Sequence, residues 1–145
     1  FERGGRTLLA AETGCGHLAV LDVATGDPLW RFRIGSGANS SPVLVGERLF
    51  TLNDGGVLTC GNATNGERLW QLRLKGPFSS TPVAAGQFIY CVSEKGVAQV
   101  VDSTKAEGEV VSELDLAEKF LSTPAIAGGA IYLRGNTRLW KFGKS

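Results

Sequence analysis

The side chains with the greatest capacity for chemistry are three thiols and one imidazole. Cys15, Cys60 and Cys91 show no C-x-x-C spacing, and their odd number allows at most one disulfide within the chain. Cys60 and Cys91 stand in apolar runs typical of strands, where a cysteine is usually a small buried hydrophobe. His17 is the only histidine, and it cannot complete a zinc site with ligands this sparse. We therefore expect inert thiols, a structural or surface histidine, and no catalytic, metal or cofactor site.

Three short motifs allow a chemical interpretation and a plainer one. Gly14–Ala19 matches G-x-G-x-x-A, but a dinucleotide site needs a helix next, and a strand pattern follows instead. Gly143–Ser145 ends like a phosphate-binding loop, but position 138, where that loop would begin with glycine, is Arg138. Asn62–Thr64 is a formal glycosylation sequon that also occupies a turn. We interpret the first and third motifs as turns, and the acidic residues show no convergence of the kind that a calcium site needs.

A repeated segment organises the residues around these motifs. Leu18–Trp30 reads LAVLDVATGDPLW, Leu58–Trp70 reads LTCGNATNGERLW, and a worn third copy lies at Ala98–Ser112. Pro42, Pro82 and Pro124 follow the same period, which is 40 residues and then 42. The recurring positions hold an Asp or Asn, a Gly and a Trp. They are Asp22, Gly26, Trp30, Asn62, Gly66, Trp70, Asp102 and Gly108.

Each repeat unit predicts four short antiparallel strands. In the unit that starts at Ser41, the apolar run Ser41–Val45 precedes alternating runs at Arg48–Asn53, Val57–Asn62 and Arg68–Leu74. The turns between them are too short for any but antiparallel pairing. We expect the Asp and Asn residues to accept backbone hydrogen bonds in the turns, and the glycines to supply positive φ angles. The tryptophans are too large for one thin sheet and should pack across to a neighbouring sheet.

These units predict an all-β propeller segment with four-stranded antiparallel blades, since a sheet with two apolar faces needs a neighbour on each side. The chain reads as one domain over residues 1–145, with blade units at about 6–34, 41–74, 81–116 and 123–142. The first unit should lack its innermost strand and the last its outermost, which leaves two whole and two partial blades. Open faces and strand edges invite association. We expect the missing neighbours to be the remaining blades of a larger parent, of about eight blades, or a second copy of the chain.

The pattern L-D-x-x-T-G-x-x-x-W followed by S-P-V-x-x-G resembles the PQQ-like, quinoprotein-type β-propeller repeat. It is carried by Leu18–Trp30, Ser40–Phe50, Asn62–Trp70 and Ser79–Tyr90, and the resemblance covers essentially the whole chain. That family contains calcium- and quinone-dependent dehydrogenases as well as non-catalytic scaffolds, and the ending Ile131–Ser145 resembles the last blade of the scaffold members. The dehydrogenases commonly carry two adjacent cysteines beside the cofactor, and this chain has no such pair.

The resemblance implies a non-catalytic scaffold that binds a protein partner through its loop face. One alternative is the C-terminal fragment of a PQQ-dependent dehydrogenase whose active-site residues lie outside this chain. A second is the sensor domain of a kinase or transporter. The scaffold members imply a bacterial protein of the periplasm or the cell exterior.

Charge and hydropathy restrict the partners further. Fifteen basic and fourteen acidic residues are interspersed, which argues against nucleic acid, and no apolar run reaches the length of a membrane span. In a propeller, the loops that enter the inner strands share one face with the loops between second and third strands. We predict a binding rim there, although the two phenylalanines could instead pack over the blade ends. The rim consists of Asn39, Ser40, Asn53, Asp54, Phe78, Ser79, Glu94, Lys95, Phe120 and Arg134.

Overall fold

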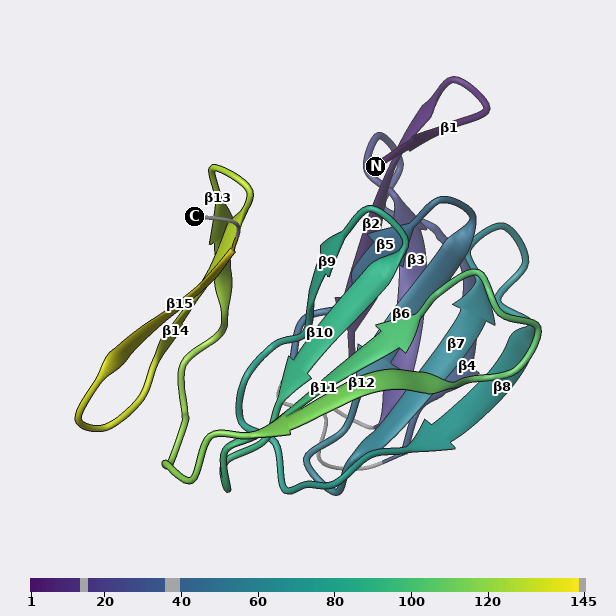
Figure 1. Cartoon of the computed structure of the whole chain (residues 1–145). Coiled ribbons are helices and arrows are strands. Elements are labelled where there is room, and N and C mark those ends of the chain that lie inside the picture. The colour runs from purple at the N-terminus through teal and green to yellow at the C-terminus, as the bar shows by residue number, and fades with distance from the viewer. Residues whose placement is uncertain (14–15, 36–39, 144–145) are drawn as a thin grey trace.

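The structure is a computed structural model that describes residues 1–13, 16–35 and 40–143, and all regular structure in these ranges is β-strand. The strands form three four-stranded sheets and one three-stranded sheet, all antiparallel and ordered as in the sequence (Figure 1). The first sheet contains β1 (Glu2–Arg3), β2 (Arg6–Glu12), β3 (His17–Asp22) and β4 (Pro28–Arg33). The second contains β5 (Val43–Val45), β6 (Arg48–Leu52), β7 (Val57–Asn62) and β8 (Arg68–Arg73). The third contains β9 (Val83–Ala85), β10 (Phe88–Val92), β11 (Val97–Asp102) and β12 (Val110–Asp115), and the last contains β13 (Ala125–Ala127), β14 (Ala130–Arg134) and β15 (Leu139–Gly143).

The prediction that the first unit lacks its innermost strand was wrong, because β1 occupies that place in the first sheet. Glu2 pairs with Thr7 and Arg3 pairs with Arg6, so β1 is a two-residue strand before β2. A strand of this length shows no alternation that a pattern could detect. Arg3 extends from β1 to the second sheet, where its guanidinium donates to Thr64 Oγ1 and to the Gly46 carbonyl. The last sheet has three strands among the described residues, as predicted.

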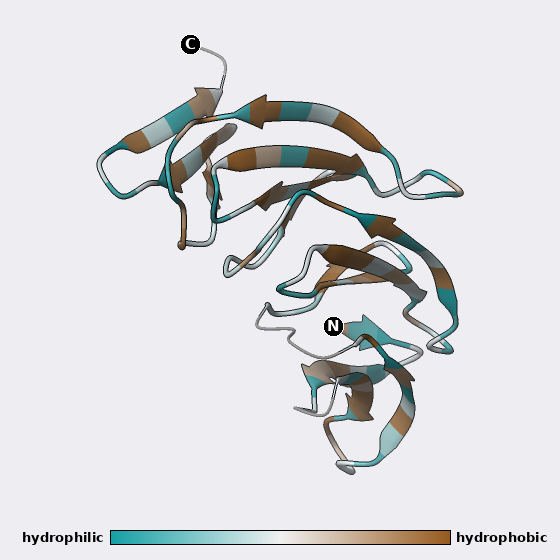
Figure 2. Cartoon of the chain, turned by 90° about the horizontal axis from the view of Figure 1, so that it is seen from below, coloured by the Kyte–Doolittle hydropathy of each residue, from teal (hydrophilic) through white to brown (hydrophobic). Residues whose placement is uncertain are grey.

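The four sheets follow one another around an arc with their faces stacked, and apolar residues recur along their strands (Figure 2). The largest core cluster lies between the second and third sheets, where Phe50, Cys60 and Trp70 meet Ile89 and Cys91. Two smaller clusters fill the junctions on either side of it. A core distributed over the junctions between sheets is what the repeat predicts, because each sheet buries its faces only against its neighbours.

The repeat tryptophans pack onto glycines of the following sheet. A Cβ atom built on Gly66 would lie 2.5 Å from the Trp30 ring, and one built on Gly108 would lie 2.8 Å from the Trp70 ring. Gly66 also has φ of +75°, which fits the predicted turn, whereas Gly108 is not among the residues with positive φ. Gly108 was expected to supply a positive φ angle to its turn, and that expectation was wrong. This position needs a glycine because Trp70 and Leu72 occupy the space of a side chain.

The turns between third and fourth strands are held as predicted. Asp22 Oδ1 accepts a hydrogen bond from the Ala24 N–H at 2.9 Å, and Asp102 Oδ1 accepts one from the Thr104 N–H at the same distance. Asn62 Oδ1 accepts from the Thr64 N–H at 2.7 Å. The equivalent residues of three repeats thus perform the same local task.

Adjacent sheets are joined near their innermost strands by backbone-to-hydroxyl hydrogen bonds. The Ser41 N–H donates to Thr81 Oγ1 at 3.2 Å, and the Thr81 N–H donates to Thr123 Oγ1 at 3.1 Å. Each bond starts on one sheet and ends on the equivalent residue of the next. At the opposite ends of the strands, the Arg48 guanidinium of the second sheet donates to the Ser103 and Lys105 carbonyls of the third sheet, both at 2.6 Å.

Candidate protein-binding surface

The loop face is built from hairpin loops and from linkers that fold back over them. The hairpin loops are 53–56 and 93–96, and the linkers run from each outer strand to the next inner strand. The Phe78 N–H donates to the Asp54 carbonyl at 2.9 Å, and the Phe120 N–H donates to the Glu94 carbonyl at 3.2 Å. Glu94 in turn donates its own N–H to the Pro77 carbonyl at 2.8 Å. These bonds fix the linkers against the hairpins, so the face has a defined shape.

The two phenylalanines of the predicted rim are buried. Phe78 is 3% exposed and belongs to the core between the second and third sheets. Phe120 is 1% exposed and packs with Val92 and Leu133 between the third and last sheets. Their assignment to an exposed rim was wrong, because the linkers direct both rings inward, where water is excluded. Both rings pack in the core beneath the linkers of the loop face.

The polar part of the predicted rim divides by exposure. Asp54, Ser79, Lys95 and Arg134 are exposed, and Asn53 and Glu94 are half-buried. Ser79 donates its hydroxyl to Glu94 Oε1, which connects a linker to a hairpin loop. Asn39 lies outside the described residues, as does Cys15.

Ser40, the remaining rim residue, is structural. It is 8% exposed and donates its hydroxyl to the Leu52 carbonyl at 2.6 Å. Ser80 and Ser122 make the same bond to the Val92 and Arg134 carbonyls, each at 2.8 Å. These serines tie each linker to the end of a second strand.

An open depression of about 510 Å³ lies on the loop face over the third sheet. It brings together Glu94 and Lys95, which the sequence analysis named, with Pro77, Ala117, Glu118 and Lys119, which it did not. Lys119 is exposed beside the hairpin of the last sheet, where the Asn136 N–H donates to the Lys119 carbonyl at 3.2 Å. The repeat places the linkers 76–81 and 118–123 on the loop face, but it does not indicate which of their side chains meet the hairpin loop 93–96.

Glu118 anchors the last sheet to this face. Its carboxylate accepts hydrogen bonds from the Thr137 N–H at 2.5 Å, the Thr137 hydroxyl at 2.7 Å and the Trp140 Nε1–H at 2.8 Å. The Arg138 N–H donates a longer bond of 3.2 Å. The Trp140 bond, followed by those from Thr137, lowers the pKa of Glu118 from 4.5 to about 2. Gly135 permits this approach, because a Cβ atom there would lie 2.4 Å from the Glu118 carboxyl carbon.

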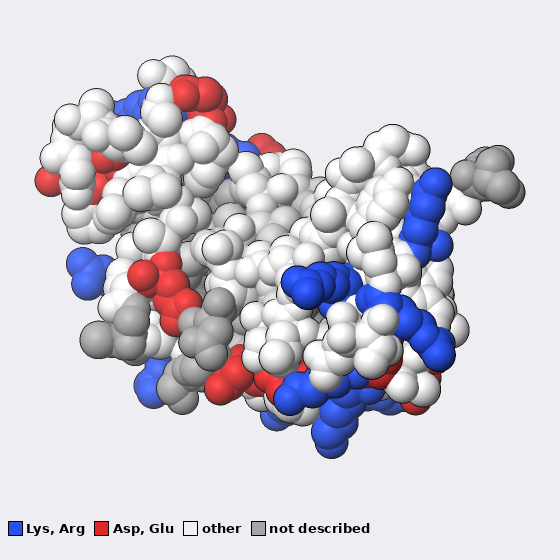
Figure 3. Space-filling view, turned by 90° about the vertical axis from the view of Figure 1, so that its left-hand side faces the viewer, with Lys and Arg blue, Asp and Glu red and all other residues white. Residues whose placement is uncertain are grey.

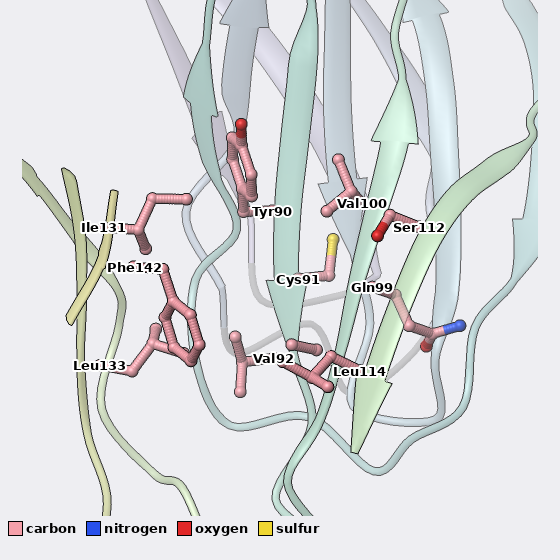
Figure 4. A pocket seen from close by; sticks show the side chains of 11 residues that line it. Tyr90, Cys91, Val92, Gln99, Val100, Ser112, Leu114, Ile131, Leu133 and Phe142 are labelled. Atoms are coloured by element: carbon pink, nitrogen blue, oxygen red, sulfur yellow. The ribbon is translucent and has the colours of Figure 1, made fainter. Parts of the chain in front are cut away.

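An apolar cavity of about 240 Å³ separates the third sheet from the last one (Figure 4). Tyr90 and Val92 line it from β10, whereas Ile131, Leu133 and Phe142 line it from β14 and β15. Its lining holds few polar groups, so it offers packing space and little chemistry.

The thiols and acids of the described residues form no reactive cluster. Burial raises the pKa of Cys60 to about 11 and that of Cys91 to about 12, so both thiols are protonated at neutral pH. Both cysteines are free. Within the described ranges, no group of three or more His, Cys, Asp and Glu side chains is arranged to bind a metal ion. No helix among these residues is long and apolar enough to cross a membrane.

Antiparallel four-stranded sheets, stacked face to face around an arc and joined by short loops, define a segment of a β-propeller. Comparison with protein families matches residues 14–107 to the family of outer membrane protein assembly factor BamB, and the chain belongs to this family. The PQQ-like resemblance inferred from the repeat is thereby confirmed. No curated protein sequence matches the chain.

Solved structures agree with this fold. BamB from Moraxella catarrhalis superposes with a TM-score of 0.81 at 17% identity, and the match covers 97% of this chain and 47% of that one. The computationally designed Ika4 protein has a TM-score of 0.77 at 11% identity, with 100% and 88% covered. The dihydro-heme d1 dehydrogenase NirN, solved in complex with DHE, has a TM-score of 0.75 at 16% identity, with 99% and 33% covered. At these identities the likeness shows the fold alone, and this chain spans about half the length of the BamB structure.

Proposed function

We propose that the chain is a non-catalytic propeller module that binds another protein through its loop face. The observation that carries this proposal is the charged group around the depression over the third sheet, where the exposed Lys95 and Lys119 lie together with the half-buried Glu94. The loops that present them are fixed by backbone hydrogen bonds and by the buried Phe78 and Phe120 rings. A preformed surface loses little conformational entropy on binding, which favours recognition of a folded partner.

Family membership supports the same proposal. The family is described as an outer membrane protein assembly factor, so its members assist other proteins. We therefore propose that the partner is a protein in or near the outer membrane, and that the chain lies outside the cytoplasm of a bacterial cell. The blade units at about 41–74, 81–116 and 123–142 remain the proposed modules of this scaffold, and the unit proposed at about 6–34 extends back to include β1.

The proposal is tested by capture of a partner from a bacterial cell-envelope extract. The immobilised chain should retain a discrete set of proteins, and Lys95→Glu with Lys119→Glu should reduce that set at least about tenfold by reversing the local charge. Lys105→Glu is the matched control, since Lys105 is an exposed cation in the turn between β11 and β12, at the end of the third sheet away from the loop face. Equal loss in the control, or undiminished capture by the double variant, would refute the loop face as the binding surface.

A further inference from the structure

The last sheet exposes one face that no described strand covers. Tyr132 pairs with Lys141 and Arg134 pairs with Leu139, so these four side chains lie on one side of the sheet. The Lys141 Nζ atom lies 5.9 Å from the centre of the Tyr132 ring, in agreement with this placement. We call these four residues the outer face of the last sheet. The opposite side carries Leu133 and Trp140, which pack toward the third sheet.

The register of the other sheets shows what happens at these positions when a neighbour is stacked on them. In the second sheet, the pairs Phe50–Cys60 and Leu52–Leu58 occupy the places of Tyr132–Lys141 and Arg134–Leu139. All four of those side chains are at most 1% exposed. In the third sheet, the corresponding pairs are Tyr90–Val100 and Val92–Ala98. The positions are therefore the buried centre of a junction between two sheets.

The last sheet places two cations at this centre. Arg134 stands where the second sheet has Leu52, and Lys141 stands where it has Cys60. A sheet that covered this face would take both charges out of water, which is unfavourable unless each charge gains an opposite charge. The first sheet shows that burial at this position disfavours a charge. Glu12 pairs with Leu18 as Arg134 pairs with Leu139, and burial raises the pKa of Glu12.

A second copy of the chain does not meet this requirement. The face that it would bring is the outer face of the first sheet, where Leu9 pairs with Leu21 and Ala11 pairs with Ala19. These four residues carry no carboxylate. Glu2, which pairs with Thr7 on the same side of the sheet, lies on the innermost strand, and its carboxylate already accepts a hydrogen bond from the Thr7 hydroxyl. Strand β4 adds Arg31 opposite Ala19 and Arg33 opposite His17, both exposed cations. Head-to-tail stacking of two copies would place cations near cations.

We propose that the outer face of the last sheet is an interaction surface for a protein sheet that presents carboxylates opposite Arg134 and Lys141. Leu139, which is 71% exposed, and Tyr132 supply the apolar contacts between the charges. Lysine and arginine side chains gather on this side of the molecule (Figure 3). This surface is separate from the depression on the loop face, and the inference does not depend on the proposed function.

The test uses the full 145-residue chain and two synthetic β-hairpin peptides. One peptide alternates Glu and Val on one face, and the matched peptide has Gln in place of every Glu. Titration is followed by the backbone NMR signals of Tyr132 and Leu139. At low salt the Glu peptide should bind at least about tenfold more tightly than the Gln peptide, and this preference should disappear in Arg134→Gln with Lys141→Gln.

Four results would overturn the proposal. The first is equal binding of the two peptides, and the second is a preference that survives in the double variant. The third is a stable dimer of the unaltered chain, seen by light scattering, that the double variant abolishes, since this would make a second copy the occupant. Arg31→Gln with Arg33→Gln is the matched control and should leave the preference unchanged. If vesicles of anionic lipid displace the Glu peptide and shift the same signals, the face instead recognises a lipid surface and the proposal fails.

Discussion

Glu118 joins two parts of the chain through one carboxylate, which accepts bonds from the hairpin between β14 and β15 and from the Trp140 indole. The tryptophans of the earlier repeats have no such acceptor, since Trp30 Nε1 and Trp70 Nε1 are buried without a partner among the described residues. We predict that Glu118→Gln loosens the last sheet, because an amide is a weaker acceptor than a carboxylate. Hydrogen exchange should become faster in β13–β15 and stay unchanged in β5–β8. Glu107→Gln, an exposed change elsewhere, is the control.

The same carboxylate should make attachment of the last sheet depend on pH. The folded pKa of about 2 lies below the ordinary 4.5, so the stabilising contribution is complete above about pH 4.5 and is lost as the pH falls toward 2. The NMR signal of the Trp140 indole N–H should move in that window. A titration that is the same in Glu118→Gln would show that another group is responsible.

Phe120 illustrates what a residue pattern cannot decide. Its place in the repeat matches Phe78, but whether a ring points outward or inward depends on the path of the linker and on the next sheet. Because Phe120 is 1% exposed, Phe120→Ala should lower the free energy of unfolding by about 3–5 kcal/mol. Leu121→Ala is the control, since Leu121 is 52% exposed and should change stability by less than about 0.5 kcal/mol. Urea unfolding of both variants measures the difference, and similar midpoints would contradict the placement of the ring.

At the scale of the elements, two turn glycines separate backbone conformation from crowding. Gly86 has φ of +58° and open space around it, whereas Gly96 has φ of +90° and would place a Cβ atom 2.3 Å from the Glu118 carbonyl oxygen. Gly86→Ala should cost about 1–2 kcal/mol from backbone strain alone. Gly96→Ala adds a clash with backbone and should lower the urea midpoint much further. Equal midpoints would mean that the hairpin loop 93–96 and the linker do not touch.

The strands were predictable from the sequence where they are long enough to alternate. The strands from β2 onward follow from period-two patterns. The turns between them follow from Asp and Asn residues that accept backbone hydrogen bonds and from glycines that supply positive φ angles. The innermost strand β1 was missed because two residues carry no period. The depression around Lys119 and the anchor at Glu118 were missed for another reason, since both depend on linkers packing against a neighbouring sheet. Local sequence does not record such contacts.

At the scale of the whole molecule, the reactivity of Cys60 and Cys91 can be used to measure how often the second and third sheets separate. Both belong to the core between the second and third sheets, and their thiols have pKa values of about 11 and 12. In a Cys15→Ser variant, we predict that a thiol reagent at pH 8 labels these residues only at the rate at which that junction opens. Urea well below the unfolding midpoint should accelerate labelling. Immediate labelling of the native chain would mean that the junction is open.

The hydroxyl bonds beside the innermost strands give the chain a direction. Ser41 donates to Thr81 and Thr81 donates to Thr123, so every bond points from a sheet to its successor. Because all these bonds run in the same direction, a duplicated unit can be inserted between two existing ones. Its hydroxyl accepts a hydrogen bond from the unit before, and its backbone N–H donates one to the unit after. A unit inserted backwards would set two donors or two acceptors against each other. The repeat is therefore suited to growth by tandem duplication, and its blade number can change without redesign of the joints.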